Sequence, residues 1–162
     1  MKNLILIAFS ILVLFNISCQ PEKCCAPPPP PSAITAEKNG NAWLLPIIKS
    51  SFLNNNIAIS TVGPYLLNTA NDSLSISLAY TGLGSYTPTD QQFGYTVFTN
   101  GVKTKYLLDT NFYNSFNITE FAVQSALDPV EMKATFNLRF VDPAHTTSVA
   151  LAGGKFTAIL HQ

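Results

Sequence analysis

The side chains that could do chemistry in this 162-residue chain are few, and their spacing matches no catalytic or metal-binding motif. His145 and His161 are the two histidines, and neither has a histidine or cysteine at the spacing that a zinc ion requires. The chain contains no G-x-S-x-G nucleophile turn, no glycine-rich phosphate loop and no H-E-x-x-H sequence. We therefore expect neither a metal ion nor a cofactor.

Carboxylates are the remaining catalytic candidates, because glycosidases place two of them about 5 to 9.5 Å apart. Glu120 and Glu131 lie in or beside predicted strands. Five aspartates fall at predicted turns, where Asp is favoured because it bonds to its own backbone: Asp72, Asp90, Asp109, Asp128 and Asp142. The turn explanation covers most of the acids, so we expect that the protein is not an enzyme. A hydrolase whose acids converge in space is the alternative.

The three cysteines, Cys19, Cys24 and Cys25, lie close together near the start of the chain. Ahead of them, Lys2 and the apolar run Leu4–Phe15 have the layout of a secretory signal. A helix of that length rises about 18 to 22 Å, which is short of the roughly 30 Å hydrocarbon core of a membrane. We predict a signal peptide over residues 1–18, and no disulfide in the folded domain because no cysteine occurs after residue 25.

Asn16-Ile17-Ser18 leads into Cys19 and resembles a lipobox, the motif at which bacterial enzymes attach lipid to a cysteine and cleave before it. Ile17 and Ser18 suit the motif, and Asn16 departs from its usual aliphatic residue. The resemblance implies that Cys19 carries palmitate-like acyl chains, which anchor a protein stably when two or three are present. It implies an address in the cell envelope, at the outer membrane, facing the periplasm or the medium. An ordinary signal peptide with an incidental cysteine is the alternative.

Residues 19–33 are predicted to be a tether. Its five consecutive prolines, Pro27–Pro31, favour the polyproline II conformation and form a semi-rigid spacer of roughly 15 Å. A ligand for a proline-reading domain is the alternative. The folded domain is expected over residues 34–162, where roughly 130 residues suffice for one core without disulfides.

The hydrophobic pattern of this domain is that of β-strands, because apolar and polar residues alternate. The clearest run would bury Met132, Ala134, Phe136, Leu138 and Phe140 and expose Lys133, Thr135, Asn137 and Arg139. Similar runs cover Ile57–Ile59, Leu74–Tyr80 and Phe156–Leu160. A short turn of helix over Tyr65–Ala70 is the one exception considered.

Turn residues separate these runs. Asn39-Gly40 and Asn100-Gly101 predict type I′ hairpins, because both central residues of that turn need positive φ. Further breaks are predicted at Gly63-Pro64, Asn71-Asp72, Asp128-Pro129, Asp142-Pro143 and Gly153-Gly154. The fold class is therefore expected to be all-β, an antiparallel sandwich or barrel of about nine or ten strands. The pattern does not distinguish the two architectures.

Several short motifs resemble those of uncharacterised Bacteroidota lipoproteins that consist of a lipid signal and one all-β domain. They are Asn39-Gly40-Asn41-Ala42-Trp43, Asn117-Ile118-Thr119, Ala134-Thr135-Phe136-Asn137-Leu138 and Gly154-Lys155-Phe156. Ala134 departs from the glycine of the family pattern. Proteins of this kind have no assigned activity, so the resemblance implies the fold and the address but no site residues.

Aromatic residues supply the candidate binding site. Thr81–Gln92 is a long loop that carries Tyr86, and long loops are often functional. Asn111–Phe116 mixes aromatic rings with amides, which suits stacking on sugars or contact with a protein. We name Tyr86, Phe112 and Tyr113 as candidate ligand-binding residues. The alternative is that Phe112, Phe116 and Trp43 fill the core while the loop only connects strands.

Charge argues against nucleic acid as a partner. Lys2 is the one charged residue of the leader, so the rest of the chain carries eight basic residues, scattered along it, against nine acidic ones. The leading hypothesis is a non-enzymatic domain, tethered to the membrane through Cys19, that binds a glycan, a small apolar ligand or an envelope protein. A structural or adhesive envelope component that pairs through strand edges is the second hypothesis, and a hydrolase is the third.

Overall fold

The computed structural model describes residues 32–61, 72–99, 102–123 and 129–162, which belong to one compact unit, Pro31–Gln162. The described residues contain ten strands and no helix, which confirms the all-β prediction. The strands are β1 (Ala33–Lys38), β2 (Asn41–Leu53), β3 (Asn56–Thr61), β4 (Asp72–Ala79), β5 (Gly84–Tyr86), β6 (Phe93–Thr99), β7 (Val102–Leu108), β8 (Ser115–Ala122), β9 (Val130–Val141) and β10 (Ser148–Leu160).

Some predictions concern residues outside this described part. They are the signal peptide and the three cysteines, the proline tract, the turn at Gly63-Pro64, the short helix over Tyr65–Ala70, the dipeptide Asn100-Gly101, and Asp128.

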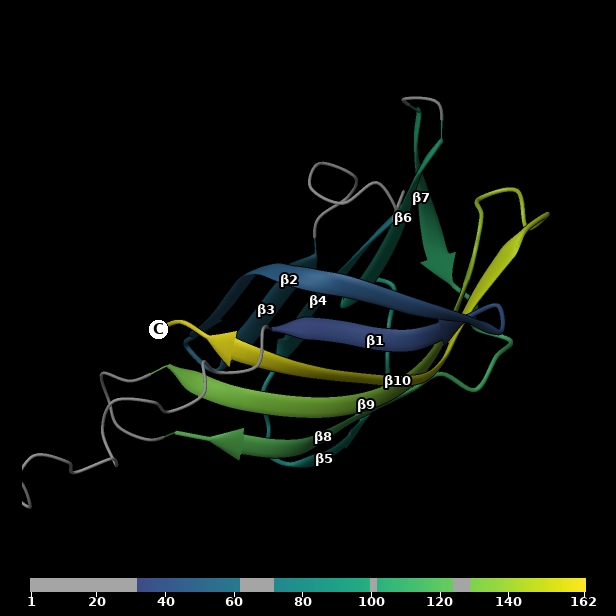
Figure 1. Cartoon of the computed structure of the whole chain (residues 1–162). Helices are drawn as coiled ribbons and strands as arrows, with labels where there is room; N and C mark the ends of the chain where they lie inside the picture. Colours follow the sequence, from purple (N-terminus) through teal and green to yellow (C-terminus); the bar gives the residue numbers. More distant parts are fainter. Residues whose placement is uncertain (1–31, 62–71, 100–101, 124–128) are drawn as a thin grey trace, which may run out of the picture. The chain divides into compact units, whose positions relative to one another are not determined.

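Eight of the strands close into an antiparallel barrel. Their order is β1-β2-β3-β4-β6-β7-β9-β10, and β10 pairs with β1 to complete the ring. Two more strands continue outward from β9: β8 pairs with β9, and β5 pairs with β8 (Figure 1). One edge of β9 serves two partners, because β8 pairs with its first part and β7 with its last residues, Phe140 and Val141. The backbone pairing thus selects the barrel over the sandwich.

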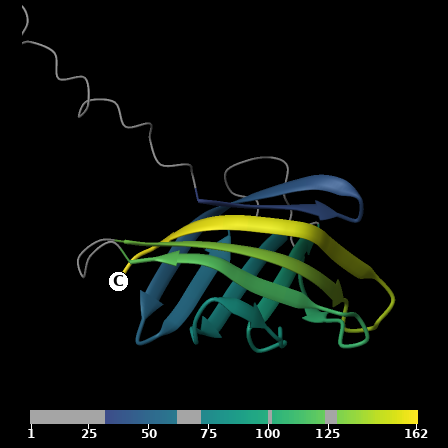
Figure 2. The ribbon, with the colours of Figure 1, turned by 90° about the horizontal axis from the view of Figure 1, so that it is seen from below.

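The first strand of the barrel is bonded along both edges. Ala33 lies opposite Pro46 of β2 and Thr157 of β10, and the two pairings continue to Lys38. Figure 2 shows β8, β9 and β10 crossing over β3, β4 and β6 at an angle. Buried side chains of these strands belong to one hydrophobic core.

Alternating side chains fill this core as the sequence predicts. All five inward residues of β9 are at most 2% exposed: Met132, Ala134, Phe136, Leu138 and Phe140. The same alternation buries Ile57 and Ile59 of β3, Leu74, Ile76 and Leu78 of β4, and Phe156, Ala158 and Leu160 of β10. Tyr80 lies just beyond β4 and is half-buried.

Two hairpins of the ring turn on residues with positive φ. Asn39 (φ 50°) and Gly40 (φ 82°) join β1 to β2, which confirms the first predicted type I′ turn. Asn54 (φ 51°) and Asn55 (φ 61°) join β2 to β3 in the same way. This second turn was not predicted, because it contains no Asn-Gly pair, although Asn also tolerates the left-handed region.

The predicted break at Gly153-Gly154 is wrong, because β10 runs through both glycines. The pairing of β10 with β9 shifts register between Leu151 and Gly154, so the glycines form a β-bulge. Gly153 has φ 57°, and its N–H donates to Asn137 Oδ1 at 2.8 Å. At Gly154 a Cβ atom would lie 2.2 Å from the ring of Phe136. Glycine therefore lets the strand bend closely over this core ring.

Candidate functional site

The connection between β7 and β8, residues 109–114, is a tight loop held by its own backbone. The N–H of Phe112 donates to the carbonyl of Asp109 at 3.1 Å, and the N–H of Asn114 donates to the carbonyl of Phe112 at 2.9 Å. Asp109 Oδ1 accepts the N–H of Asn111 at 3.0 Å. Asp109 thus bonds to its own turn, in the way expected of an aspartate at this kind of position.

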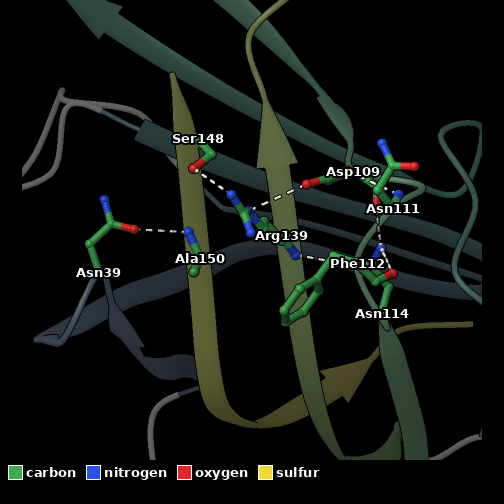
Figure 3. Close-up of polar contacts among 8 residues, drawn as sticks. All are labelled: Asn39, Asp109, Asn111, Phe112, Asn114, Arg139, Ser148 and Ala150. Carbon is green, nitrogen blue, oxygen red and sulfur yellow. Dashed lines mark hydrogen bonds and ion pairs between the residues drawn. The ribbon is translucent and has the colours of Figure 1, made fainter. Parts of the chain in front are cut away.

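The side-chain amide of Asn114 joins the loop to β9. Its Nδ2 donates to the carbonyls of Asp109 (2.7 Å) and Phe112 (3.2 Å). Its Oδ1 accepts the N–H of Arg139 at 2.8 Å (Figure 3). Both ends of the amide are therefore occupied, and the loop is fixed in place without a ligand.

Arg139 supports the same loop with its side chain. Its Nε lies 3.3 Å from Asp109 Oδ2 as an ion pair without hydrogen-bond geometry, and its Nη2 donates to Ser148 Oγ at 3.3 Å (Figure 3). The guanidinium also lies 5.9 Å from the ring centroid of Phe112, within the range of a cation–π contact. The guanidinium of Arg139 is thus paired with Asp109 and holds Phe112 in position.

Two hollows share the aromatic tip of this loop. The larger has a volume of about 370 Å³, the smaller about 280 Å³, and Phe112, Tyr113 and Ser115 line both. The larger hollow is completed by Ser85, Tyr86, Thr87, Pro88, Leu108, Thr110 and Asn114. The smaller is completed by Asn137, Leu138, Ala150, Leu151 and Ala152 of β9 and β10. The three residues named from the sequence, Tyr86, Phe112 and Tyr113, therefore meet at the larger hollow.

These three aromatic residues differ in how firmly they are held. Tyr86 is half-buried, and its phenol oxygen accepts the N–H of Thr81 (3.0 Å) and donates to the carbonyl of Gly82 (2.6 Å). Phe112 is 37% exposed and Tyr113 is 87% exposed. Tyr86 thus forms a fixed wall, whereas the ring of Tyr113 is open to solvent.

The structure corrects one prediction about a neighbouring segment and decides one of the alternatives left open. The Thr81–Gln92 connection is more than a loop, because it contains β5, whose residues Gly84 and Tyr86 lie opposite Ile118 and Phe116 of β8. Of the two phenylalanines suggested as core, Phe116 is fully buried and Phe112 is not. The short strand carries Tyr86 to the side of the 109–114 loop, which sequence distance alone did not show.

Asp72 was predicted at a turn, and this is wrong because it begins β4 and is 1% exposed. Its carboxylate forms an ion pair with Lys38, accepts a hydrogen bond from the phenol of Tyr95, and lies 3.4 Å from Nε1 of Trp43. Burial first, and then the neighbouring Asp72, raises the pKa of Tyr95 far above its usual range, so the phenol stays a donor. Trp43 is half-buried and packs against Tyr95. This is a buried polar cluster within the barrel wall.

Three other described acids, Asp142, Glu120 and Glu131, also have structural partners. Asp142 accepts the N–H groups of Thr146 and Thr147 at 2.7 Å each, and these bonds lower its pKa, that from Thr147 most. Glu120 and Glu131 both approach Lys133, at 2.7 and 3.7 Å. Within the part of the chain that the structure describes, no three His, Cys, Asp or Glu side chains gather to hold a metal ion.

In comparisons with known proteins, no family model, curated protein or solved structure matches the chain.

Proposed function

We propose that this chain is a lipid-anchored protein of the bacterial cell envelope, whose β-domain binds a ligand or partner without catalysing a reaction. The observation that carries the binding role is the fixed loop that holds Phe112 and Tyr113 between two hollows. The larger hollow falls within the usual range of roughly 300 to 1,000 Å³ for ligand sites. The hydrogen bonds of Asn114 and the ion pair of Asp109 with Arg139 already fix the loop, so little ordering free energy is lost on binding.

Exposure supports a role for the loop tip in recognition. Tyr113 presents almost its whole side chain to solvent, although the same loop has hydrogen bonds enough to fold without it. Tyrosine is favoured at interfaces because it buries a large area and loses few rotamers. We therefore assign Tyr113 the main contact, with Phe112 beside it and Tyr86 as a wall of the larger hollow.

The membrane address is carried by the sequence ahead of the domain, where the apolar run ends at Cys19. The lipobox-like tripeptide and the proline tract suit a lipid on that cysteine and a spacer behind it. In the described residues no helix is long and apolar enough to cross a membrane.

The anchor is tested by replacing Cys19 with serine. In cells fed radiolabelled palmitate we expect the unaltered chain to take up label and sediment with membranes, because acyl chains require the Cys19 thiol. The Cys19→Ser variant should lose both properties. The Cys24→Ser/Cys25→Ser variant, which keeps Cys19, is the matched control. An unlabelled wild-type chain that still begins at Met1 would contradict the proposed anchor.

The binding site is tested by placing the photoreactive residue p-benzoylphenylalanine at position 113 of the full chain. On irradiation of cells that produce the chain naturally, we expect an adduct of increased mass, because the side chain at this position faces both hollows. Mass spectrometry of the adduct identifies its chemical class.

The control carries the same residue at Leu53, which is 65% exposed and lies in β2, beside the β2–β3 turn. Identical adduct patterns at the two positions would mean that the hollows recognise nothing. Adducts at 113 with a multiple of the mass of the chain would instead favour the structural envelope component.

A further inference from the structure

We propose that the two hollows bind a neutral oligosaccharide, whose sugar rings pack against Tyr113 and Phe112. The inference rests on the proposed function, since it names the ligand of the same site. Three features of the site carry it: the absence of charge in its walls, the polar groups that line it, and the open aromatic ring.

The walls of both hollows lack charge. Among the described residues, every side chain that lines either hollow is apolar, a hydroxyl or an amide. Charged groups lie behind the walls: Arg139 and Asp109 are paired with each other beside the loop, and the Asp90 carboxylate accepts the backbone N–H of Leu108. An anionic or cationic ligand would lose part of its hydration on entering these hollows. No opposite charge in the lining would compensate that loss, so binding of a charged ligand is unfavourable. The lining therefore selects a neutral ligand.

The walls of the larger hollow are too polar for a purely apolar ligand. Hydroxyl groups line the larger hollow at Ser85, Thr87, Thr110 and Ser115, and Ser115 also lines the smaller one. A hydrocarbon would cover these groups and leave their hydrogen bonds unmade, which costs free energy. A sugar carries its own hydroxyls, which can form the hydrogen bonds that the displaced water made with these groups.

The aromatic tip supplies the other half of sugar recognition. A sugar ring presents C–H bonds on its faces and hydroxyls at its edge, so one face can lie on an aromatic ring while the edge forms hydrogen bonds. Tyr113 offers such a ring at 87% exposure, with Phe112 next to it. Since both residues line both hollows, a ligand that occupies the two must pass the aromatic tip. A chain of several sugars meets this requirement better than a single one.

The test is saturation-transfer NMR on the full chain, purified in detergent, with four neutral hexasaccharides built from glucose in β-1,4 linkage, glucose in α-1,4 linkage, mannose and xylose. We expect at least one to bind and the Tyr113→Ala variant to bind it about tenfold more weakly. Tyr113→Phe, which keeps the ring, and Leu53→Ala, at an exposed site in β2, should retain the affinity. Because the site lacks charge, added salt should leave the affinity unchanged.

Two further probes separate this inference from the proposed function. They are an oligogalacturonate, which is anionic, and the neutral apolar dye N-phenyl-1-naphthylamine. Binding of either probe in a Tyr113-dependent way, with no neutral hexasaccharide bound at its solubility limit, would overturn the oligosaccharide and leave the binding function standing. If no probe binds and position 113 also gives no specific adduct in cells, both proposals are wrong. Sugar binding that the Tyr113→Ala variant retains would overturn the assignment of the site.

Discussion

Replacing Lys38 with methionine is expected to lower the free energy of unfolding by about 3 kcal/mol. The two partners of this ion pair are unequal, because the Asp72 side chain is 2% exposed and that of Lys38 is 31% exposed. Removal of the lysine leaves the buried carboxylate with two neutral donors, the phenol of Tyr95 and Nε1 of Trp43. An uncompensated charge in a buried site is one of the few single changes that cost this much.

Urea unfolding, followed by tryptophan fluorescence, measures this loss. The control is Lys49→Met, at an exposed lysine of β2, and it should leave the unfolding midpoint within error. In a third variant Asp72→Leu is added to Lys38→Met, so that the stranded charge is removed. We expect this double variant to be more stable than Lys38→Met alone. A double variant that is less stable would mean that the carboxylate serves Tyr95 and Trp43 more than it serves Lys38.

Replacing Phe136 with alanine is expected to cost about 3 to 5 kcal/mol, because a buried ring is exchanged for a cavity. Phe136 is 2% exposed, lies 6.4 Å from Phe156 between ring centroids, and packs against the backbone of Gly154. Thermal or urea unfolding measures the loss. Lys155→Ala, at an exposed position of β10, is the control and should change stability little.

The contact between Phe136 and Gly154 allows a related prediction about the stability of a double variant. Gly154→Ala alone should cost about 1 to 3 kcal/mol, because its methyl group would overlap the ring of Phe136. Once Phe136 is alanine, the methyl group has room. The double variant should therefore lose less stability than the sum of the two single variants. Strict additivity would show that the bulge and the core ring do not constrain each other.

Much of the fold could be predicted from the sequence, because strands with one buried face show a regular alternation of apolar and polar residues. In β9 one outward residue separates each inward apolar residue from the next. An error of one residue in register would therefore turn every inward side chain of the strand outward. That regularity gave the buried faces of β3, β4, β9 and β10. It could not give the neighbours of each strand, since alternation states which side is covered and not which strand lies alongside. The choice of a closed barrel therefore required the structure.

The turns show where short-range rules fail. Asn39-Gly40 turns a hairpin, whereas Gly153-Gly154 lies within a strand, although both contain residues with positive φ. Glycine permits such a backbone in either setting, and the difference depends on what packs nearby. For Gly154 that neighbour is Phe136, which lies on another strand. The sequence around Gly154 therefore does not indicate this contact.

The candidate site was predictable in part, by composition. Tyr86, Phe112 and Tyr113 stand out because they are aromatic residues among turn-forming and polar ones. The residues that fix the site were missed. Asn114 is bonded to Arg139, 25 positions away, and Arg139 was predicted only as an outward residue of a strand. The signal that could have indicated them is the asparagine on each side of Phe112-Tyr113, at 111 and 114, since asparagine often bonds to nearby backbone.

The place of β1 in the barrel has a mechanical consequence for the tether that we propose. The chain enters the domain at Ala33, and from there β1 is bonded to β2 along one edge and to β10 along the other. Inter-strand hydrogen bonds lie perpendicular to the strands, so tension along β1 loads both ladders together in shear instead of peeling them apart bond by bond. Any drag on the domain that is transmitted through residue 33 thus meets two rows of bonds at once.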